Sequence, residues 1–257
     1  MLELKNIGKI FNPGTEDELK LFDNYSLSIN KGEFVSVVGS NGSGKTTLLN
    51  IICGFSPIDS GSIIFNGKDI TKTPEHKRAK FIGRVFQNPQ TGTCPHLTVL
   101  ENIALADSKK TGYGLSRAVN KKNIERYRSL LETCSMGLEN KLNIKCGSLS
   151  GGQRQALALV IACMTDIEML ILDEHTAALD PKSSERVMEL TDNIIKEKNL
   201  TALMVTHNLR FATEYGSRLI MLHEGKNVMD LSGDEKQTVG TDSILAQFNR
   251  ISIECGN

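Results

Sequence analysis

The sequence predicts an α/β protein with a mainly parallel sheet, accompanied by antiparallel β structure and by a helical region. Short apolar runs that end in glycine or aspartate alternate with helical patterns in both halves of the chain. Such alternation is typical of parallel strands covered by helices. From about residue 88 to residue 148 the strand patterns disappear, and helical patterns alternate with polar, lysine-bearing stretches.

In the first 87 residues, the most informative element is an apolar strand at Phe34–Val38 that stops at Gly39. A helical pattern runs from Thr46 to Ile52 and ends at Gly54, a residue that favours helix C-termini. The order is therefore strand, glycine-rich turn, helix. Further strands are predicted at Leu2–Ile7, Leu27–Ile29, Ser62–Phe65 (turning at Asn66-Gly67) and Phe81–Phe86.

The later part of the chain alternates helices and strands. Within residues 88–148, helices are predicted at Val99–Leu105 and Lys122–Leu131. Beyond them, the predicted elements are a helix at Gln153–Cys163, a strand at Met169–Asp173, a helix at Ser183–Lys196 and a strand at Thr201–Thr206. The tail from Lys226 is less periodic, and no element is predicted there.

The composition excludes several classes of protein. The chain has 257 residues, 39% of them hydrophobic, with 30 basic and 30 acidic residues. This apolar content and charge balance exclude intrinsic disorder, and the length suits one domain or two closely packed subdomains. Because the chain has no basic excess, we expect no nucleic acid among its partners.

We expect the chain to be cytoplasmic. No apolar stretch approaches the roughly 20 residues that cross a bilayer as a helix, and Met1–Ile7 shows no secretory signal. The six cysteines contain no C-x-x-C pair, and in a reducing compartment we interpret them as buried or incidental thiols. They are Cys53, Cys94, Cys134, Cys146, Cys163 and Cys255.

A phosphate-binding motif, G-x-x-x-x-G-K-[ST], follows the strand Phe34–Val38. Its residues are Gly39, Ser40, Asn41, Gly42, Ser43, Gly44, Lys45 and Thr46, with Thr47 next in the helix. Glycines let successive backbone N–H groups turn toward phosphate oxygens, and the helix N-terminus adds partial positive charge. We expect Lys45 to reach the β- and γ-phosphates and the Thr46 hydroxyl to ligate Mg²⁺. A flexible glycine turn is the alternative, whereas the order of the glycines excludes the dinucleotide-binding motif.

Two acidic residues, Asp173 and Glu174, stand at the end of the predicted strand Met169–Asp173. Ligands of open α/β sheets bind at the carboxyl ends of the strands, so we expect Asp173 to lie close to Thr46 and the metal. Glu174 would face the γ-phosphate and orient or deprotonate the attacking water, a role typically worth ~100- to 10,000-fold in rate. A helix cap or a solvated turn is the alternative.

A second anion site is predicted at Leu149-Ser150-Gly151-Gly152-Gln153, where a serine and two glycines precede a helix. This run resembles the signature sequence of ATP-binding cassette (ABC) ATPases, which carry their phosphate loop, signature and acid pair in this order. The resemblance covers nearly the whole chain and implies a single ABC ATPase domain. It would comprise a P-loop NTPase core (residues 1–87 and 149–225), an antiparallel β subdomain, a helical subdomain (88–148) and a C-terminal tail (226–257).

Four more positions match the family one at a time. Gln87 resembles the glutamine that contacts Mg²⁺ and water, or it is a surface glutamine. Asp180 resembles a residue that touches the partner subunit, or it is a plain helix N-cap. His207 is placed like the histidine that hydrogen-bonds the γ-phosphate, or it is structural. Phe11 resembles the aromatic residue that stacks on adenine, with Tyr25 as a rival and a core phenylalanine as the alternative.

His175 departs from the family pattern, because many members have proline after the acid pair. It adds a titratable group beside Glu174, and the resemblance gives it no role. The run from Asp173 to Pro181, together with Val205–Asn208, resembles ATPase subunits of bacterial importers, in particular a group linked to aromatic amino-acid uptake.

The resemblance implies an ATP-hydrolysing subunit that powers solute import, with ATP and Mg²⁺ as cofactors. Two copies would form a homodimer in which Ser150 of one copy closes over the ATP held by Lys45 of the other. The implied partners are separate membrane permease subunits and, indirectly, an extracytoplasmic solute-binding protein, which places the chain at the cytoplasmic face of the membrane. An exporter's ATPase subunit, a soluble mechanical ATPase and a non-enzymatic nucleotide-binding adaptor are the alternatives.

Overall fold

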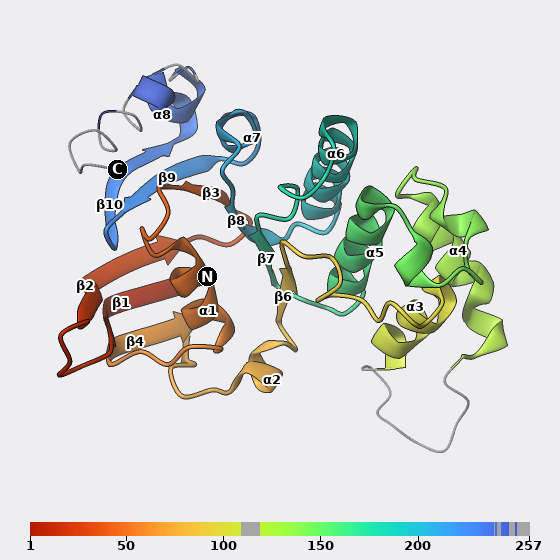
Figure 1. The fold of residues 1–257 in the computed structure, drawn as a ribbon, viewed down its shortest axis with the longest axis horizontal. Coiled ribbons are helices and arrows are strands. Elements are labelled where there is room, and N and C mark those ends of the chain that lie inside the picture. Colours follow the sequence, from red (N-terminus) through yellow and green to blue (C-terminus); the bar gives the residue numbers. More distant parts are fainter. Residues whose placement is uncertain (109–118, 239, 241–242, 247–249, 251–257) are drawn as a thin grey trace. The chain divides into compact units, whose positions relative to one another are not determined.

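The computed structural model describes residues 1–108, 119–238, 240, 243–246 and 250 (Figure 1). These residues form two compact units, of which the first comprises Met1–Ala79 and Asn199–Asn257 and the second Lys80–Lys198. The second unit is larger than the predicted helical subdomain, because it also contains two strands and two long helices. Part of that predicted subdomain (109–118), much of the predicted tail and Cys255 lie outside the described residues.

An antiparallel sheet forms the beginning of the first unit, with the strand order β2-β1-β4-β5. β1 extends past the predicted end at Ile7. Asn6 adopts a left-handed φ of 50° and the register with β2 shifts after Leu4, so the strand is irregular at this point. Such a bulge breaks the two-residue alternation from which a strand is recognised. The strands are β1 (Leu2–Phe11), β2 (Leu19–Ile29), β4 (Ser60–Phe65) and β5 (Lys68–Asp69).

Parallel strands form the rest of the sheet structure of the first unit. β3 (Phe34–Val38) pairs in parallel with β8 (Thr201–Val205) on one side and β9 (Arg218–His223) on the other, and every residue of β3 and β8 is buried. β10 (Lys226–Ser232) runs antiparallel to β9. The helices of this unit are α1 (Lys45–Cys53), α2 (Glu75–Arg78), α7 (Leu209–Glu214) and α8 (Gly233–Thr238).

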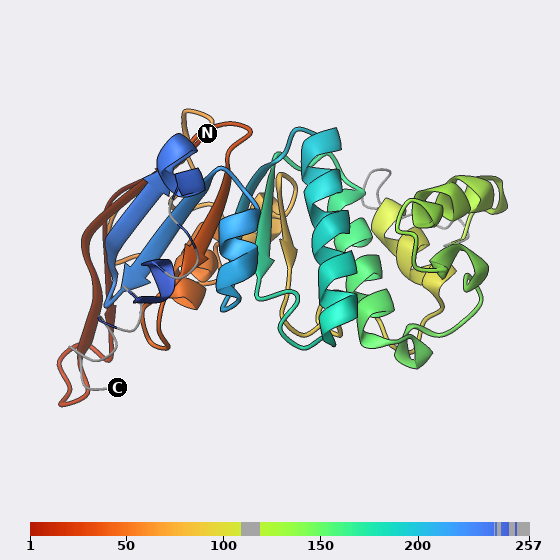
Figure 2. The same cartoon turned by 90° about the horizontal axis from the view of Figure 1, so that it is seen from above.

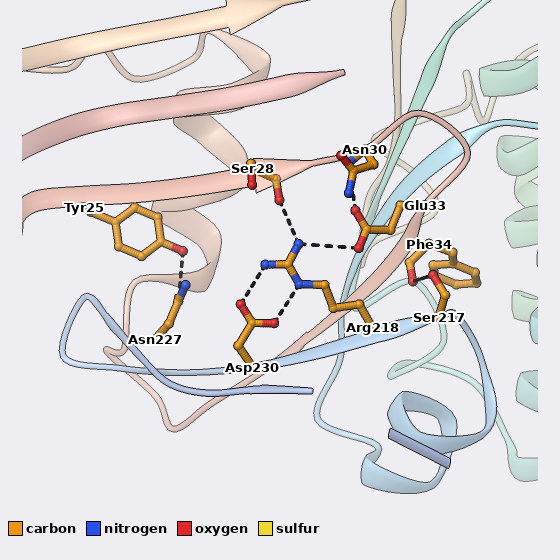
Figure 3. A network of polar contacts seen from close by, with 9 residues as sticks. All are labelled: Tyr25, Ser28, Asn30, Glu33, Phe34, Ser217, Arg218, Asn227 and Asp230. Carbon is orange, nitrogen blue, oxygen red and sulfur yellow. Dashed lines mark hydrogen bonds and ion pairs between the residues drawn. The ribbon is translucent and has the colours of Figure 1, made fainter. Parts of the chain in front are cut away.

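Neither β9 nor β10 is predicted from the sequence. β9 buries the apolar run Leu219–Leu222, and polar contacts join β10 to β9 and to β2 (Figure 3). The Arg218 guanidinium binds Asp230 through two hydrogen bonds of 2.6 and 2.7 Å and donates a third, of 2.8 Å, to the carbonyl oxygen of Ser28. Tyr25 donates to Asn227 Oδ1 at 2.9 Å. The β10 residues alternate between exposed and half-buried, so their apolar pattern is weak.

The second unit contains a parallel strand pair and its helices. β6 (Ile82–Val85) pairs with β7 (Met169–Asp173), with Arg84 opposite Ile171 and Val85 opposite Leu172. Helix α5 contacts β6 and lies beside α6 (Figures 1 and 2). The helices are α3 (Val99–Asp107), α4 (Ile124–Glu132), α5 (Gly151–Cys163), α6 (Pro181–Glu197) and the 3-10 helices η2 (Lys121–Asn123), η3 (Leu138–Asn140) and η4 (Cys146–Ser148).

The predicted α/β class with parallel strands is confirmed, and so are the predicted helices, each within a few residues of its ends. In the described part of the chain, no helix is both long enough and apolar enough to cross a membrane. The five cysteines in that part are free thiols, four of them buried, in agreement with the prediction.

Candidate functional site

The loop between β3 and α1 requires glycine at particular positions of the motif. Gly42 and Gly44 adopt left-handed φ angles of 77° and 105°, where other residues are strained. A Cβ at Gly39 would lie 2.1 Å from the carbonyl oxygen of Leu222, so only glycine fits where β3 ends. The chain can therefore turn sharply from the strand into α1, as the motif predicts.

Lys45 and Ser43 bring buried polar groups into this loop. Lys45 is 5% exposed, and its Nζ donates to the carbonyl oxygens of Gly39 and Ser40, each at 2.8 Å. The buried Ser43 Oγ finds no hydrogen-bond partner among the described residues. An unsatisfied buried hydroxyl costs about 1–3 kcal/mol, which a ligand with an acceptor oxygen would remove. Thr46 is exposed and Thr47 is half-buried.

A cavity of about 580 Å³ lies beside the loop in the first unit. Its volume falls in the range of small-molecule sites. It is lined by Leu19, Lys20, Leu21 and Asp23 of β2, Ser40 to Ser43 of the loop, and His223 to Lys226 at the turn between β9 and β10.

Phe11 and Tyr25, the two rival aromatic residues, have different surroundings. The Phe11 ring is 36% exposed, and the Lys9 ammonium stands 5.4 Å from its centroid. Tyr25 is 6% exposed, packs against Phe22 and is tied through its hydroxyl to Asn227 (Figure 3). Burial raises the pKa of Tyr25 well above its usual value. Tyr25 is thus a core residue, whereas Phe11 is partly exposed.

The acid pair stands at the end of β7. Asp173 Oδ2 accepts a hydrogen bond of 2.6 Å from Arg84 Nη2, and the two side chains are only 13% and 9% exposed. Glu174 has a left-handed φ of 46°, uncommon for a residue with a side chain, and its carbonyl oxygen accepts from the N–H of Ala177. The chain therefore turns at Glu174, directly after the end of β7.

Gln87 is exposed and lies just beyond β6. The carbonyl oxygen of the preceding residue, Phe86, accepts a hydrogen bond of 3.0 Å from Gln155 Nε2 in α5. The Arg84 guanidinium lies over the Phe86 ring, 4.7 Å from its centroid. Sequence reasoning missed both Arg84 and Gln155, since neither stands in a recognised motif.

The signature run and Asp180 come together where α5 and α6 begin. Ser150 is the N-cap of α5 and forms a capping box with Gln153. Asp180 is the N-cap of α6, and its bonds from Ser183 lower the pKa of the Asp180 carboxyl. Gly152 leaves room for α6, because a Cβ at this position would lie 2.9 Å from Ser183 Cβ, whereas a Cβ at Gly151 would lie 3.2 Å from Leu179 Cδ2.

The two histidines differ in exposure. His175 is 2% exposed and its Nε2 lies 3.1 Å from Thr191 Oγ1. Since Thr191 donates its own proton to the carbonyl oxygen of Val187, the His175 Nε2–H is the donor of this bond. Burial lowers the pKa of His175 to about 4, so its ring is neutral at pH 7. His207 is exposed and follows β8 in the first unit.

Comparisons with known sequences agree with the motifs. The sequence profile of the ABC transporter family matches residues 22–177. The chain is 49% identical to the tyrosine transport ATP-binding protein of Clostridioides difficile, over 96% of this chain and 98% of that protein. It is 32% identical to the xylose/arabinose import ATP-binding protein of Sulfolobus acidocaldarius, over 100% of this chain and 98% of that protein.

Solved structures show the same fold. A dimeric ATP-binding cassette in a post-hydrolysis state, bound to ADP and Pi, matches 90% of this chain and 98% of its own length, with a TM-score of 0.77 and 31% identity. The ADP conformation of another cassette matches 100% of this chain and 99% of its own length, with a TM-score of 0.79 and 28% identity. The fold and the ATPase activity implied by the motifs are thereby confirmed, and the chain is an ATP-hydrolysing member of the ABC transporter family.

Proposed function

We propose that this chain hydrolyses ATP to power the uptake of an aromatic amino acid, tyrosine first, through separate membrane permease subunits. The observation that carries the proposal is the 49% identity with the C. difficile tyrosine transport protein across almost the whole of both chains. The second relative named above is an import ATP-binding protein. This favours import over the exporter and mechanical ATPase alternatives.

The loop Gly39–Thr47 would hold the triphosphate of ATP. Its left-handed glycines let backbone N–H groups turn toward phosphate oxygens, and Lys45 brings a buried positive charge. The Ser43 hydroxyl has no hydrogen-bond partner among the described residues, and a phosphate oxygen could accept its hydrogen bond. Phe11, which is partly exposed, would stack on adenine.

A magnesium ion would be held by Thr46, Gln87 and Asp173. Their hydroxyl, amide and carboxylate oxygens are the hard donors that Mg²⁺ prefers, so these residues fit the ion. When bound, Mg²⁺ neutralises charge on the β- and γ-phosphates. Glu174 would orient the attacking water and accept its proton, and His207 would hydrogen-bond the γ-phosphate.

A second copy of this chain would complete each site. Ser150, Gly151, Gly152 and Gln153 would close over the nucleotide of the other copy, with Asp180 touching that copy close by. The N-terminus of α5 favours an anion, and the dimeric cassette with ADP and Pi supports the homodimer. We place the assembly at the cytoplasmic face of the membrane, supplied by an extracytoplasmic solute-binding protein.

Reconstitution tests this function. The chain is co-expressed with the permease and binding-protein genes beside its own gene, and the purified complex is placed in liposomes that enclose ATP and Mg²⁺. We expect uptake of labelled tyrosine but not of xylose or spermidine, and loss of uptake with Glu174→Gln. Uptake of a sugar or polyamine alone would contradict the proposed substrate class. Co-purification with ribosomes or DNA in place of a permease would contradict the proposed role as a transporter subunit.

A further inference from the structure

Arg84 and Asp173 form an ion pair on neighbouring parallel strands. The two strands run in parallel with Val85 opposite Leu172, and Asp173 follows at the end of β7. Arg84 Nη2 lies 2.6 Å from Asp173 Oδ2, and both side chains are about nine-tenths buried. At this depth, water screens a pair of charges much less than at the surface.

The Arg84 guanidinium also contacts an aromatic ring. It lies over the ring of Phe86, whose carbonyl oxygen is bound by Gln155 of α5. Arg84 therefore differs from a surface arginine that can swing into solvent. Its positive charge has a fixed place beside one carboxylate oxygen.

We propose that Arg84 is a positioning residue for Asp173, and that its charge competes with Mg²⁺ for that carboxylate. The inference rests on the proposed role of Asp173 as a magnesium ligand. Without metal, the guanidinium neutralises an acid that would otherwise be buried and unpaired. With metal, two cations share one carboxylate and repel each other, so the ion binds firmly only when ATP phosphates supply further negative charge.

Removing this charge should have two linked effects. Arg84→Gln should lower the melting temperature of the metal-free protein, because Asp173 loses its partner. The same variant should bind Mn²⁺, a spectroscopic substitute for Mg²⁺, about tenfold more tightly in the presence of ATP, because a nearby positive charge has gone. Arg84→Lys loses the planar contact with Phe86 but keeps the positive charge, so its Mn²⁺ affinity should stay within about threefold of that of the wild type.

The experiment measures Mn²⁺ affinity by electron paramagnetic resonance with saturating ATP, and melting temperatures with ATP plus either EDTA or Mg²⁺. Arg126→Gln is the matched control, since Arg126 also pairs with an aspartate of the second unit, Asp107, but is 58% exposed. We expect Arg84→Gln to show tighter Mn²⁺ binding and a larger stabilisation by Mg²⁺ than the wild type, Arg84→Lys and Arg126→Gln. Equal or weaker Mn²⁺ binding in Arg84→Gln would overturn the inference.

Two further outcomes are decisive. If the wild type shows no metal-dependent binding of ATP, the proposed function fails and not only the role of Arg84. If Arg84→Gln does not fold, the inference is tested in the wild type instead, by ¹⁵N NMR measurement of the rotation rate of the Arg84 guanidinium. Addition of Mg²⁺ to the ATP-bound protein should then speed rotation of the Arg84 guanidinium, and an unchanged signal would overturn the inference.

Discussion

Gly152 in α5 lies so close to Ser183 in α6 that a Cβ at position 152 would stand 2.9 Å from Ser183 Cβ. Ser150 begins α5 and Asp180 begins α6, so this approach fixes two motif residues relative to each other. The absence of a side chain at Gly152 permits it.

Gly152→Ala should therefore destabilise the fold by about 1–3 kcal/mol, as overpacking does in a close contact. Gly151→Ala is the control, because its Cβ would meet only the flexible end of Leu179 at 3.2 Å. Urea unfolding measures both, and we expect Ser183→Gly to reduce the cost of Gly152→Ala. Equal stability of the two alanine variants would show that the contact with Ser183 does not restrict the size of the side chain at position 152.

Several elements that bury a continuous apolar run are predicted from the sequence, but β9, which buries Leu219 to Leu222, is missed although it carries the same signal. The strands Phe34–Val38 and Met169–Asp173 agree with the structure at both ends. β10 could not be predicted because its residues alternate only between exposed and half-buried, and because one of its polar contacts, Tyr25–Asn227, joins residues far apart in the chain. Apolar periodicity carries no trace of such contacts.

Phe11→Ala should weaken ATP binding by about 1–3 kcal/mol, through loss of stacking on the base. Tyr25→Phe should leave ATP affinity unchanged and lower stability by about 1 kcal/mol, because it removes the hydrogen bond to Asn227. Calorimetric titration and thermal unfolding separate the two effects. An ATP affinity that responds to Tyr25→Phe but not to Phe11→Ala would reverse the assignment.

His175 should make stability depend on pH. Its folded pKa of about 4 lies below the ordinary value of 6.5, so between these values the unfolded chain binds a proton that the folded chain does not. The free energy of unfolding should thus fall as the pH drops from about 6.5 to about 4, by up to ~3 kcal/mol from this residue.

His175→Gln removes that contribution and can still donate to Thr191. Urea unfolding at pH 7 and at pH 4.5 should show a smaller loss of stability in the variant than in the wild type. Parallel losses in the two proteins would mean that His175 is protonated in the folded state.

The motif residues of the site could be found from the sequence because glycine spacing and strand ends are local features. Arg84 and Gln155 could not, because each acts through a partner on another element, Asp173 in one case and the Phe86 carbonyl in the other. His175 was found as a departure from the family pattern, but only the structure shows that it is buried beside Thr191, where burial lowers the pKa of its ring.

Glu174→Gln should leave Mg²⁺-dependent ATP binding intact and slow hydrolysis by at least ~100-fold, because the amide cannot accept the proton of water. Phosphate release with saturating ATP measures the rate, and size-exclusion chromatography with ATP should show a more persistent dimer. Unchanged turnover would remove Glu174 from the proton transfer.

The most direct test is calorimetric titration of the purified wild type and of Lys45→Ala with ATP, with Mg²⁺ and with EDTA. Mg²⁺ should strengthen the binding of ATP by the wild type, and Lys45→Ala should weaken this binding by at least tenfold, since Lys45 supplies the buried positive charge of the loop. No magnesium-dependent binding in the wild type, or equal affinity in Lys45→Ala, would contradict the account.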